Sequence, residues 1–269
     1  MNLPDPNADS HGARATLLCS FSYPSWAVKG MTNKLVILWA PPRSLSTAFV
    51  RMIEARGDFT VLHEPLCDLA AGHVFTHEVQ GETHRIDTPK RLFAHVRTLL
   101  DKGNVFIKDT CEFSYAGFID EGAYPDEAHH AFMIRNPEQV INSHYAMNPQ
   151  LTSQQVGYQH LDALYWAAKA RSVHDPVVVD ANQLVQDPPK VIADFCRKIG
   201  IEQKPESLQW EPGHRRVWER TRHWHEDTAR STSIRPVSKH YEVRVDNDPR
   251  LKSFYDDNLV VYKKFLSYP

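Results

Sequence analysis

The sequence contains few cysteines and no long apolar run. Four cysteines stand among 269 residues, at Cys19, Cys67, Cys111 and Cys196, and no two form a C-x-x-C pair. This spacing indicates neither a disulfide-rich secreted domain nor a cysteine zinc site, so we expect free thiols in a reducing compartment. The longest wholly apolar stretches, such as 35–42, fall far short of the roughly 20 residues that cross a bilayer, and no membrane span is predicted.

The chain also lacks an excess of charge of either sign. It carries 31 Lys and Arg against 33 Asp and Glu, a formal net charge of -2. No global basic field would attract nucleic acid, so no nucleic-acid partner is expected and any anion site must be local. An apolar fraction of 42% and a charged fraction of 24% are ordinary for a globular protein and argue against a disordered or collagen-like chain.

The first 33 residues differ in composition from the rest. They are rich in Pro, Ser, Asn and Asp, and Asp5 and Asp9 stand where a signal peptide would carry positive charge. We predict that residues 1–33 form a poorly ordered extension and that residues 34–269 form a single domain. We expect the protein to be cytoplasmic.

From residue 34 onward, short apolar runs alternate with helical patterns. Strands are predicted at 34–39, 59–62, 105–107, 131–134 and 177–179, and helices at 45–56, 88–102, 137–145, 158–171, 189–199 and 249–266. Segment 71–87 is predicted to be a loop, and segment 202–245 is irregular. The alternation favours a three-layer α/β fold with a central parallel sheet between two layers of helices.

Polar residues follow four of the predicted strands. In open parallel sheets, ligands bind at these carboxyl ends. The residues there are Arg43, Ser44, Ser46, Thr47, His63, Glu64, Lys108, Asp109 and Arg135. Three of the four strand ends carry a cation although the whole chain is slightly acidic, so the sequence indicates an anionic ligand.

The loop after the first strand has the properties of a phosphate cradle. It brings backbone N–H groups at a helix start together with the hydroxyls of Ser44, Ser46 and Thr47 and the guanidinium of Arg43. The alternative is that Ser44 only caps the helix and Arg43 is solvated. The loop lacks the two glycines and the lysine of the G-x-x-x-x-G-K-[ST] motif, which disfavours an ATP-dependent kinase.

A second segment, Arg135-Asn-Pro-Glu-Gln-Val-Ile-Asn-Ser143, pairs a strand-end arginine with a helix serine. Together with Pro42-Arg-Ser-Leu-Ser-Thr47, it resembles the sulfotransferases that use 3′-phosphoadenosine 5′-phosphosulfate (PAPS). The resemblance implies a P-loop-like sulfotransferase fold, in which the first loop holds the 5′-phosphosulfate and Arg135 and Ser143 hold the 3′-phosphate. Leu45 stands where that family commonly has glycine.

Two further segments are similar to tyrosylprotein and bacterial sulfotransferases. They are Ile107-Lys-Asp109 and Arg230-Ser-Thr-Ser-Ile-Arg-Pro-Val237. By this resemblance, Lys108 and Ser231 would contact the sulfate end of PAPS, and Glu64 would be the general base, with His63 as its nearest rival. The donor-binding residues implied are Arg43, Ser44, Leu45, Ser46, Thr47, Arg135, Ser143, Arg230, Ser231, Thr232 and Arg235.

The resemblance therefore implies a sulfotransferase that uses PAPS as cosubstrate and needs no metal. Arg43 and Lys108 would neutralise the leaving phosphate, and the acceptor would be a hydroxyl, or an amine, of a small molecule, glycan or peptide. His129, His130, His223 and His225 have no third ligand at a known zinc spacing, so no zinc site is predicted. A catalytically inactive nucleotide-binding module and, less favoured, an ATP-dependent phosphotransferase stay open as alternatives.

Overall fold

The computed structural model describes residues 33–115 and 125–268. These residues fall in one compact unit, Asn33–Pro269. The predicted extension lies outside the described residues apart from Asn33, and so does Cys19. The other three cysteines are free thiols, as expected.

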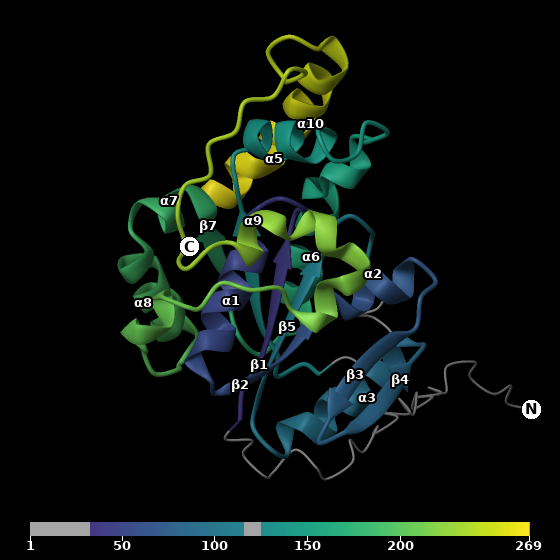
Figure 1. Ribbon diagram of the computed structural model, residues 1–269, viewed down its shortest axis with the longest axis vertical. Helices are drawn as coiled ribbons and strands as arrows, with labels where there is room; N and C mark the ends of the chain where they lie inside the picture. Colours follow the sequence, from purple (N-terminus) through teal and green to yellow (C-terminus); the bar gives the residue numbers. More distant parts are fainter. Residues whose placement is uncertain (1–32, 116–124, 269) are drawn as a thin grey trace, which may run out of the picture. The chain divides into compact units, whose positions relative to one another are not determined.

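A five-stranded parallel sheet forms the centre of this unit (Figure 1). Its strands are β1 (Leu35–Ala40), β2 (Phe59–His63), β5 (Asn104–Thr110), β6 (His129–Ile134) and β7 (Val177–Asp180), arranged in the order β2-β5-β1-β6-β7. Every residue of the central strand β1 is buried, which explains why that strand has an uninterrupted apolar sequence. The predicted α/β fold with a central parallel sheet is confirmed.

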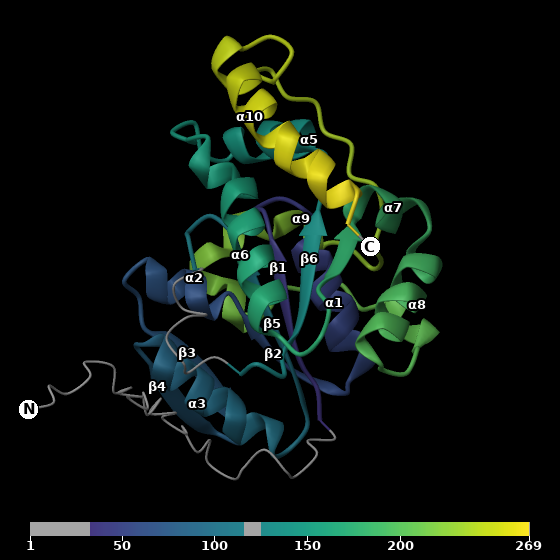
Figure 2. The ribbon, with the colours of Figure 1, turned by 180° about the vertical axis from the view of Figure 1, so that it is seen from behind.

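Helices cover both faces of the sheet (Figures 1 and 2). Helices α1 (Ser46–Arg56) and α8 (Pro188–Ile199) pack on one face, and α3 (Pro89–Leu100), α6 (Tyr158–Arg171) and α10 (Pro249–Leu266) pack on the other. Because side chains alternate along a strand, Ile37 and Trp39 enter one hydrophobic core while Val36 and Leu38 enter the other.

Side-chain caps fix where several helices begin. The hydroxyl or side-chain oxygen of the capping residue accepts a hydrogen bond from a first-turn N–H, and a proline follows in most cases. These caps are Thr88 of α3, Asn136 of α5 (Pro137–Tyr145), Asp180 of α7 (Ala181–Gln186), Asp187 of α8 and Asp248 of α10. Within residues 33–115 and 125–268, the other helical elements are α2 (Pro65–Ala70), α9 (Glu226–Ala229) and the 3-10 helices η2 (Gln154–Val156), η3 (Pro205–Leu208) and η4 (Arg216–Trp224).

The prediction that segment 71–87 is a loop was wrong. Strands β3 (Phe75–Val79) and β4 (Glu82–Ile86) form an antiparallel hairpin there. Its turn consists of Gln80 and Gly81, which both have positive φ values, of 52° and 85°. Only Phe75 and Ile86 of the hairpin are buried, so its polar, exposed positions hid the strand pattern.

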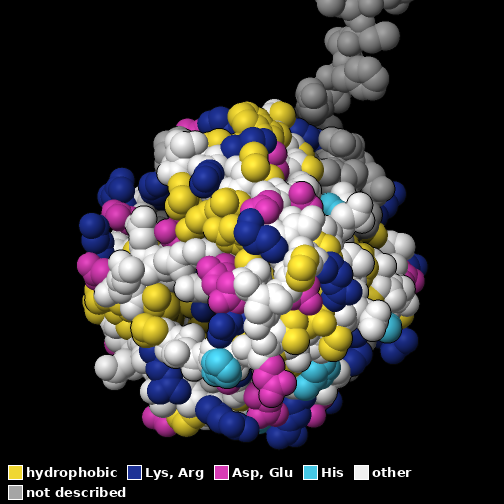
Figure 3. Space-filling model, turned by 90° about the horizontal axis from the view of Figure 1, so that it is seen from above, with side chains coloured by type: hydrophobic (Ala, Val, Ile, Leu, Met, Phe, Trp, Pro, Cys, Tyr) yellow, Lys and Arg dark blue, Asp and Glu magenta, His cyan; other side chains and the backbone are white. Residues whose placement is uncertain are grey.

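The described helices include none that could span a bilayer. On the face seen from above in Figure 3, basic and acidic side chains are interspersed. That face carries no large region of one sign, in agreement with the balanced charge of the sequence.

We expect Gly157→Ala to destabilise the protein, because this glycine lies against the end of β5. Its φ is +96°, and an added Cβ would lie 2.8 Å from the carbonyl oxygen of Cys111. The free energy of unfolding, measured by urea denaturation, should fall by about 2 kcal/mol or more. Gly103→Ala is the matched control, because nothing lies within 4 Å of its added Cβ. Equal stability of the two variants would contradict the close approach.

Candidate functional site

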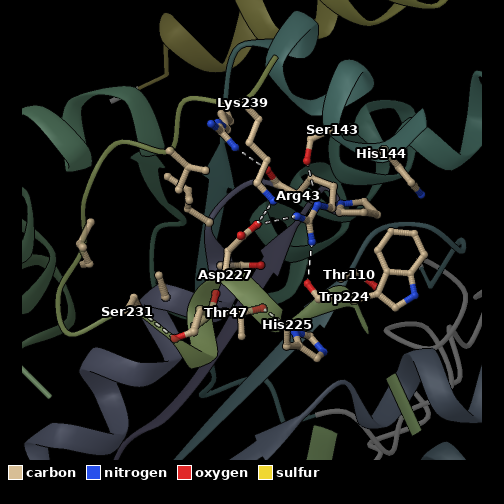
Figure 4. A pocket seen from close by; sticks show the side chains of 18 of the residues that line it. Arg43, Thr47, Thr110, Ser143, His144, Trp224, His225, Asp227, Ser231 and Lys239 are labelled. Carbon is tan, nitrogen blue, oxygen red and sulfur yellow. Dashed lines mark hydrogen bonds and ion pairs between the residues drawn. The ribbon is translucent and has the colours of Figure 1, made fainter. Parts of the chain in front are cut away.

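A pocket of about 500 Å³ opens at the carboxyl edge of the parallel sheet. Its walls come from the β1–α1 loop, the junction of β2 and α2, the ends of β5 and β6, helix α5, and segment 221–241. Figure 4 shows side chains from these distant parts of the chain turned toward one another. The pocket lies where the sequence placed the anion site.

The β1–α1 loop has an unusual backbone. Arg43 and Leu45 have φ values of 65° and 70°, in the left-handed region that favours glycine. Leu45 thus adopts the conformation expected of the glycine common in the resembled family, and its side chain packs against the core. Ser44 is buried, and its hydroxyl donates to the Pro41 carbonyl at 2.7 Å, so this hydroxyl shapes the loop and does not line the pocket.

Arg43 joins the two predicted phosphate-binding motifs. Its Nε donates to the Ser143 hydroxyl at 3.0 Å, and its Nη1 donates to the Trp224 carbonyl at 2.7 Å. Arg135 donates from Nη1 to the Arg43 carbonyl at 2.9 Å. Residues that lie about 90 to 180 positions apart in the sequence therefore meet in one hydrogen-bonded cluster, and both arginines line the pocket.

Acidic Asp227, from α9, faces this basic cluster. Its carboxylate lies 3.8 Å from Nη2 of Arg43 and also accepts from Nζ of Lys239 (Figure 4). Burial lowers the pKa of Arg43, and the charge of Asp227 opposes that change. Asp227 thus provides the negative charge that partly balances Arg43 and Lys239 at this end of the pocket.

Segment 230–241 supplies another wall of the pocket. Arg230, Ser231 and Arg235 line it, while Arg230 also donates to Glu226 at 3.0 Å. The hydroxyl of Ser231 donates to the Thr228 carbonyl at 2.7 Å.

Thr232 does not line this pocket, contrary to its predicted contact with the donor. It lines a second hollow instead, together with Trp210 and Glu211. Its carbonyl accepts from the backbone N–H of Trp210 at 2.9 Å.

Glu64 and Lys108 form a buried ion pair on the pocket wall. Glu64 has a φ of 56°, and its backbone N–H donates to the Lys108 carbonyl at 2.6 Å. The Lys108 ammonium donates to Oε1 of Glu64. Burial by itself would raise the pKa of Glu64, but Lys108 and the neighbouring His63 and His225 hold it at about 2. The cation paired with Glu64 is therefore Lys108.

Asp109 fixes the start of α2 beside this pair. Its buried carboxylate accepts from the backbone N–H groups of Leu66 and Cys67, at 3.0 and 2.9 Å. Burial raises the pKa of Asp109 to about 8, although the two backbone donors act against that rise. Asp109 is therefore a structural support for Glu64 and lies off the pocket wall.

The two histidines nearest Glu64 are neutral at pH 7. Burial lowers the pKa of His63 to about 3 and that of His225 to about 4. His63 lies behind Glu64, with Nε2 at 3.6 Å from Oε1, and is not on the pocket wall. His225 lines the pocket and contacts the Thr221 hydroxyl at 3.2 Å.

Among the described residues, one group brings three possible metal ligands together. Single ligand atoms of His63, Glu64 and His225 lie within 4.8 Å of one another. The Lys108 ammonium already occupies the cation position at the Glu64 carboxylate. A metal ion there would have to displace Lys108, so a metal-free site stays our prediction.

Several pocket residues were not singled out from the sequence. They are Cys67, Thr110, Glu112, His144, Thr221, Asp227, Lys239 and Tyr241. Thr110 and Glu112 could have been found by extending the third strand to its observed end at Thr110. Lys239 and Tyr241 follow the predicted 230–237 motif in irregular chain, where no periodicity marks them.

Comparisons with known proteins identify the family. A family model described as a sulfotransferase domain matches residues 34–255. The chain belongs to the sulfotransferase family. The predicted family is thereby confirmed, and membership implies a sulfonate-donor cosubstrate.

Two solved sulfotransferase domains share the fold. One comes from the curacin biosynthetic pathway, with a TM-score of 0.51 and 11% identity, covering 88% of this chain and 98% of that domain. The other, from the olefin synthase of Synechococcus PCC 7002, has a TM-score of 0.50 and 13% identity, covering 88% and 96%. These likenesses support the three-layer fold with a P-loop-like sheet.

One curated relative is similar over part of its length. It is the branched-chain-amino-acid aminotransferase-like protein 2 of Arabidopsis thaliana, which is 24% identical over 185 residues. The match covers 67% of this chain and 32% of that protein. The chain thus spans about a third of the length of this relative.

We expect the Glu64–Lys108 pair to be energetically coupled. Lys108→Met leaves a buried carboxylate without its cation and should lower the free energy of unfolding by about 3 kcal/mol. Adding Glu64→Gln should restore part of this loss, because the uncompensated charge is removed.

Urea denaturation of the two single variants and the double variant at pH 7 measures the coupling. Lys169→Met breaks an exposed pair with Asp175 and serves as the control, with no measurable change expected. Strictly additive effects of Lys108→Met and Glu64→Gln would mean that the pair contributes nothing beyond its separate members.

Proposed function

We propose that this sulfotransferase uses PAPS and transfers its sulfuryl group in line to a hydroxyl or amine acceptor. The observation that carries the proposal is the hydrogen bond from Arg43 to Ser143. It joins the loop predicted to hold the 5′-phosphosulfate to the helix predicted to hold the 3′-phosphate. A ligand with anionic groups at two separated positions fits this arrangement better than a single phosphate.

In the proposed complex, the two phosphate positions of the donor use different residues. The 5′-phosphosulfate lies over the β1–α1 loop, against first-turn N–H groups of α1 and the hydroxyls of Ser46 and Thr47. Ser44 acts there through its backbone, because its hydroxyl is engaged within the loop. The 3′-phosphate binds Arg135 and Ser143. Arg230, Ser231 and Arg235 close over the donor from segment 230–241.

The proposed chemistry separates the Glu64–Lys108 pair. With Lys108 bound to it, Glu64 has a pKa of about 2 and is a weak base. A bound phosphosulfate gives the Lys108 ammonium a second anion to neutralise, and the charge that builds on the bridging oxygen strengthens that contact. As Lys108 turns to the donor, the pKa of Glu64 rises and its carboxylate can accept the acceptor's proton.

Calorimetric titration with adenosine 3′,5′-bisphosphate, the product left after transfer, tests the cosubstrate. We expect micromolar binding without metal and unaffected by EDTA, with ATP much weaker. Arg135→Ala should weaken binding at least about tenfold by removing a charged contact to the 3′-phosphate. Arg85→Ala, on exposed β4, is the control.

Other outcomes of this titration would count against PAPS. Preference for ATP with Mg²⁺ would favour the phosphotransferase alternative. Tight binding of the bisphosphate with no transfer to any acceptor would favour the inactive module. Unchanged affinity in Arg135→Ala would remove that residue from the 3′-phosphate site.

Glu64→Gln should abolish transfer while leaving bisphosphate affinity within about twofold, because the base acts only on the acceptor. In the wild type, kcat/KM for PAPS should stay flat from about pH 5.5 to 8, since it reports the free protein, in which the lowered pKa of Glu64 keeps this group deprotonated throughout that window. An acidic limb within this window would contradict Glu64 as the base. Activity that survives in Glu64→Gln would move the role to His63 or elsewhere.

A further inference from the structure

The two ends of the pocket carry net charges of opposite sign. The inference drawn from this difference rests on the proposed function. At the end assigned to the donor, the wall carries five cations and one carboxylate, Asp227. The cations are Arg43, Arg135, Arg230, Arg235 and Lys239. At the end next to Glu64, the wall carries Glu64 and Glu112 but a single cation, Lys108. The acceptor end thus has the opposite sign to the donor end.

Glu112 causes this imbalance. It follows β5 by two residues, lines the pocket and is half-buried. Among the described residues, no cation or hydrogen-bond donor contacts its carboxylate, whereas Glu64 has Lys108 as a partner. Burial, followed by the charge of Glu64, raises the pKa of Glu112.

The neighbours of Glu112 do not compensate its charge. Burial raises the pKa of the Cys67 thiol to about 12, with Glu64, Asp109 and Glu112 adding to that rise, so the thiol is neutral. Thr110 offers only a hydroxyl, and Lys108 is already bound to Glu64. A half-buried carboxylate left without a partner is costly unless a ligand provides one.

We infer that the acceptor carries a positively charged amine that binds Glu112 while its hydroxyl points at Glu64. The acceptor class is therefore an amino alcohol or aminophenol. In the reaction, the bond from sulfur to the bridging phosphate oxygen breaks and a bond from sulfur to the acceptor oxygen forms. The hydroxyl proton passes to Glu64, and the products are a sulfate ester and adenosine 3′,5′-bisphosphate. The amine of the acceptor does not react.

A cationic acceptor also suits the ternary complex. PAPS brings several negative charges next to the acceptor site, and in a partly desolvated pocket these would repel an anionic acceptor. A positive group at Glu112 reduces the net charge that the closed pocket must hold. The carboxylate thereby selects among hydroxyl compounds by charge.

The test compares matched acceptors that differ in the amine. The pairs are tyramine with 4-ethylphenol, 2-aminoethanol with 1,2-ethanediol, and 4-amino-1-butanol with 1,4-butanediol, each assayed with PAPS for kcat/KM. In the wild type, kcat/KM for the amine should exceed kcat/KM for its neutral partner about tenfold or more, in every pair that contains a substrate. In Glu112→Gln, which keeps the shape and removes the charge, the preference should fall to about threefold or less.

Two controls keep the outcomes distinct. Glu206→Gln, on exposed η3, should leave the amine preference unchanged. Glu112→Gln should bind adenosine 3′,5′-bisphosphate as tightly as the wild type, because the donor end is untouched. Three outcomes would overturn the inference. The first is that the wild type uses the neutral members as well as the amines or better, and the second is that Glu112→Gln keeps the full preference. The third is that an enzyme that binds the bisphosphate transfers to none of the six compounds.

Failure of the donor assignment is detected separately. If the wild type does not bind the bisphosphate, the proposed cosubstrate is wrong, and tyramine is then titrated alone into the wild type and Glu112→Gln. Binding that the substitution weakens about tenfold supports the amine site without any assumption about the donor. Absence of binding, or equal binding by both proteins, overturns it.

Discussion

The hydrogen bond from Arg43 to Ser143 connects the parts on which the rest of the site depends. Arg43 stands in a loop between β1 and α1, and Ser143 lies on α5, which follows β6 beside β1 in the sheet. The parallel register brings both strand ends to one edge, and Arg135 completes the contact by binding the Arg43 carbonyl. The Trp224 carbonyl then ties the irregular segment to the same guanidinium.

Backbone strain is concentrated at this edge. Four non-glycine residues among those described have positive φ, and three of them, Arg43, Leu45 and Glu64, line the pocket. Each such residue costs about 1–2 kcal/mol. Hydrogen bonds nearby offset the cost, including the one from the Glu64 N–H to the Lys108 carbonyl. These hydrogen bonds stabilise the strained backbone and so maintain the shape of the pocket.

The sequence was sufficient to predict the sheet, most helices and the positions of Arg43, Lys108 and Arg135, because apolar runs and strand ends are local features. It did not predict that Lys108 would bind Glu64. That choice depends on the pairing of β2 with β5, which puts His63 opposite Lys108. The local sequence pattern does not show which strands pair or in which register.

The course of segment 205–241 could likewise not be predicted from the sequence. Arg51 of α1 is buried between Trp210 and Trp218 and donates to the carbonyls of Glu211 and Gly213, so one arginine holds this segment against the sheet domain. No spacing in the sequence relates these positions, which lie about 160 residues apart. The roles of Asp227 and Lys239 follow from that path and could not be seen without it.

Asp227 already neutralises part of the positive charge that the cations give the pocket. Its carboxylate sits against Arg43 and Lys239, so the resting protein already satisfies these cations with its own anion. In the proposed complex, a polyanionic donor would compete with this tethered carboxylate for the same two cations. Its net affinity would therefore be the difference between two ion pairings, the one it forms and the one it replaces. Removing the Asp227 carboxylate would shift that difference in favour of the donor.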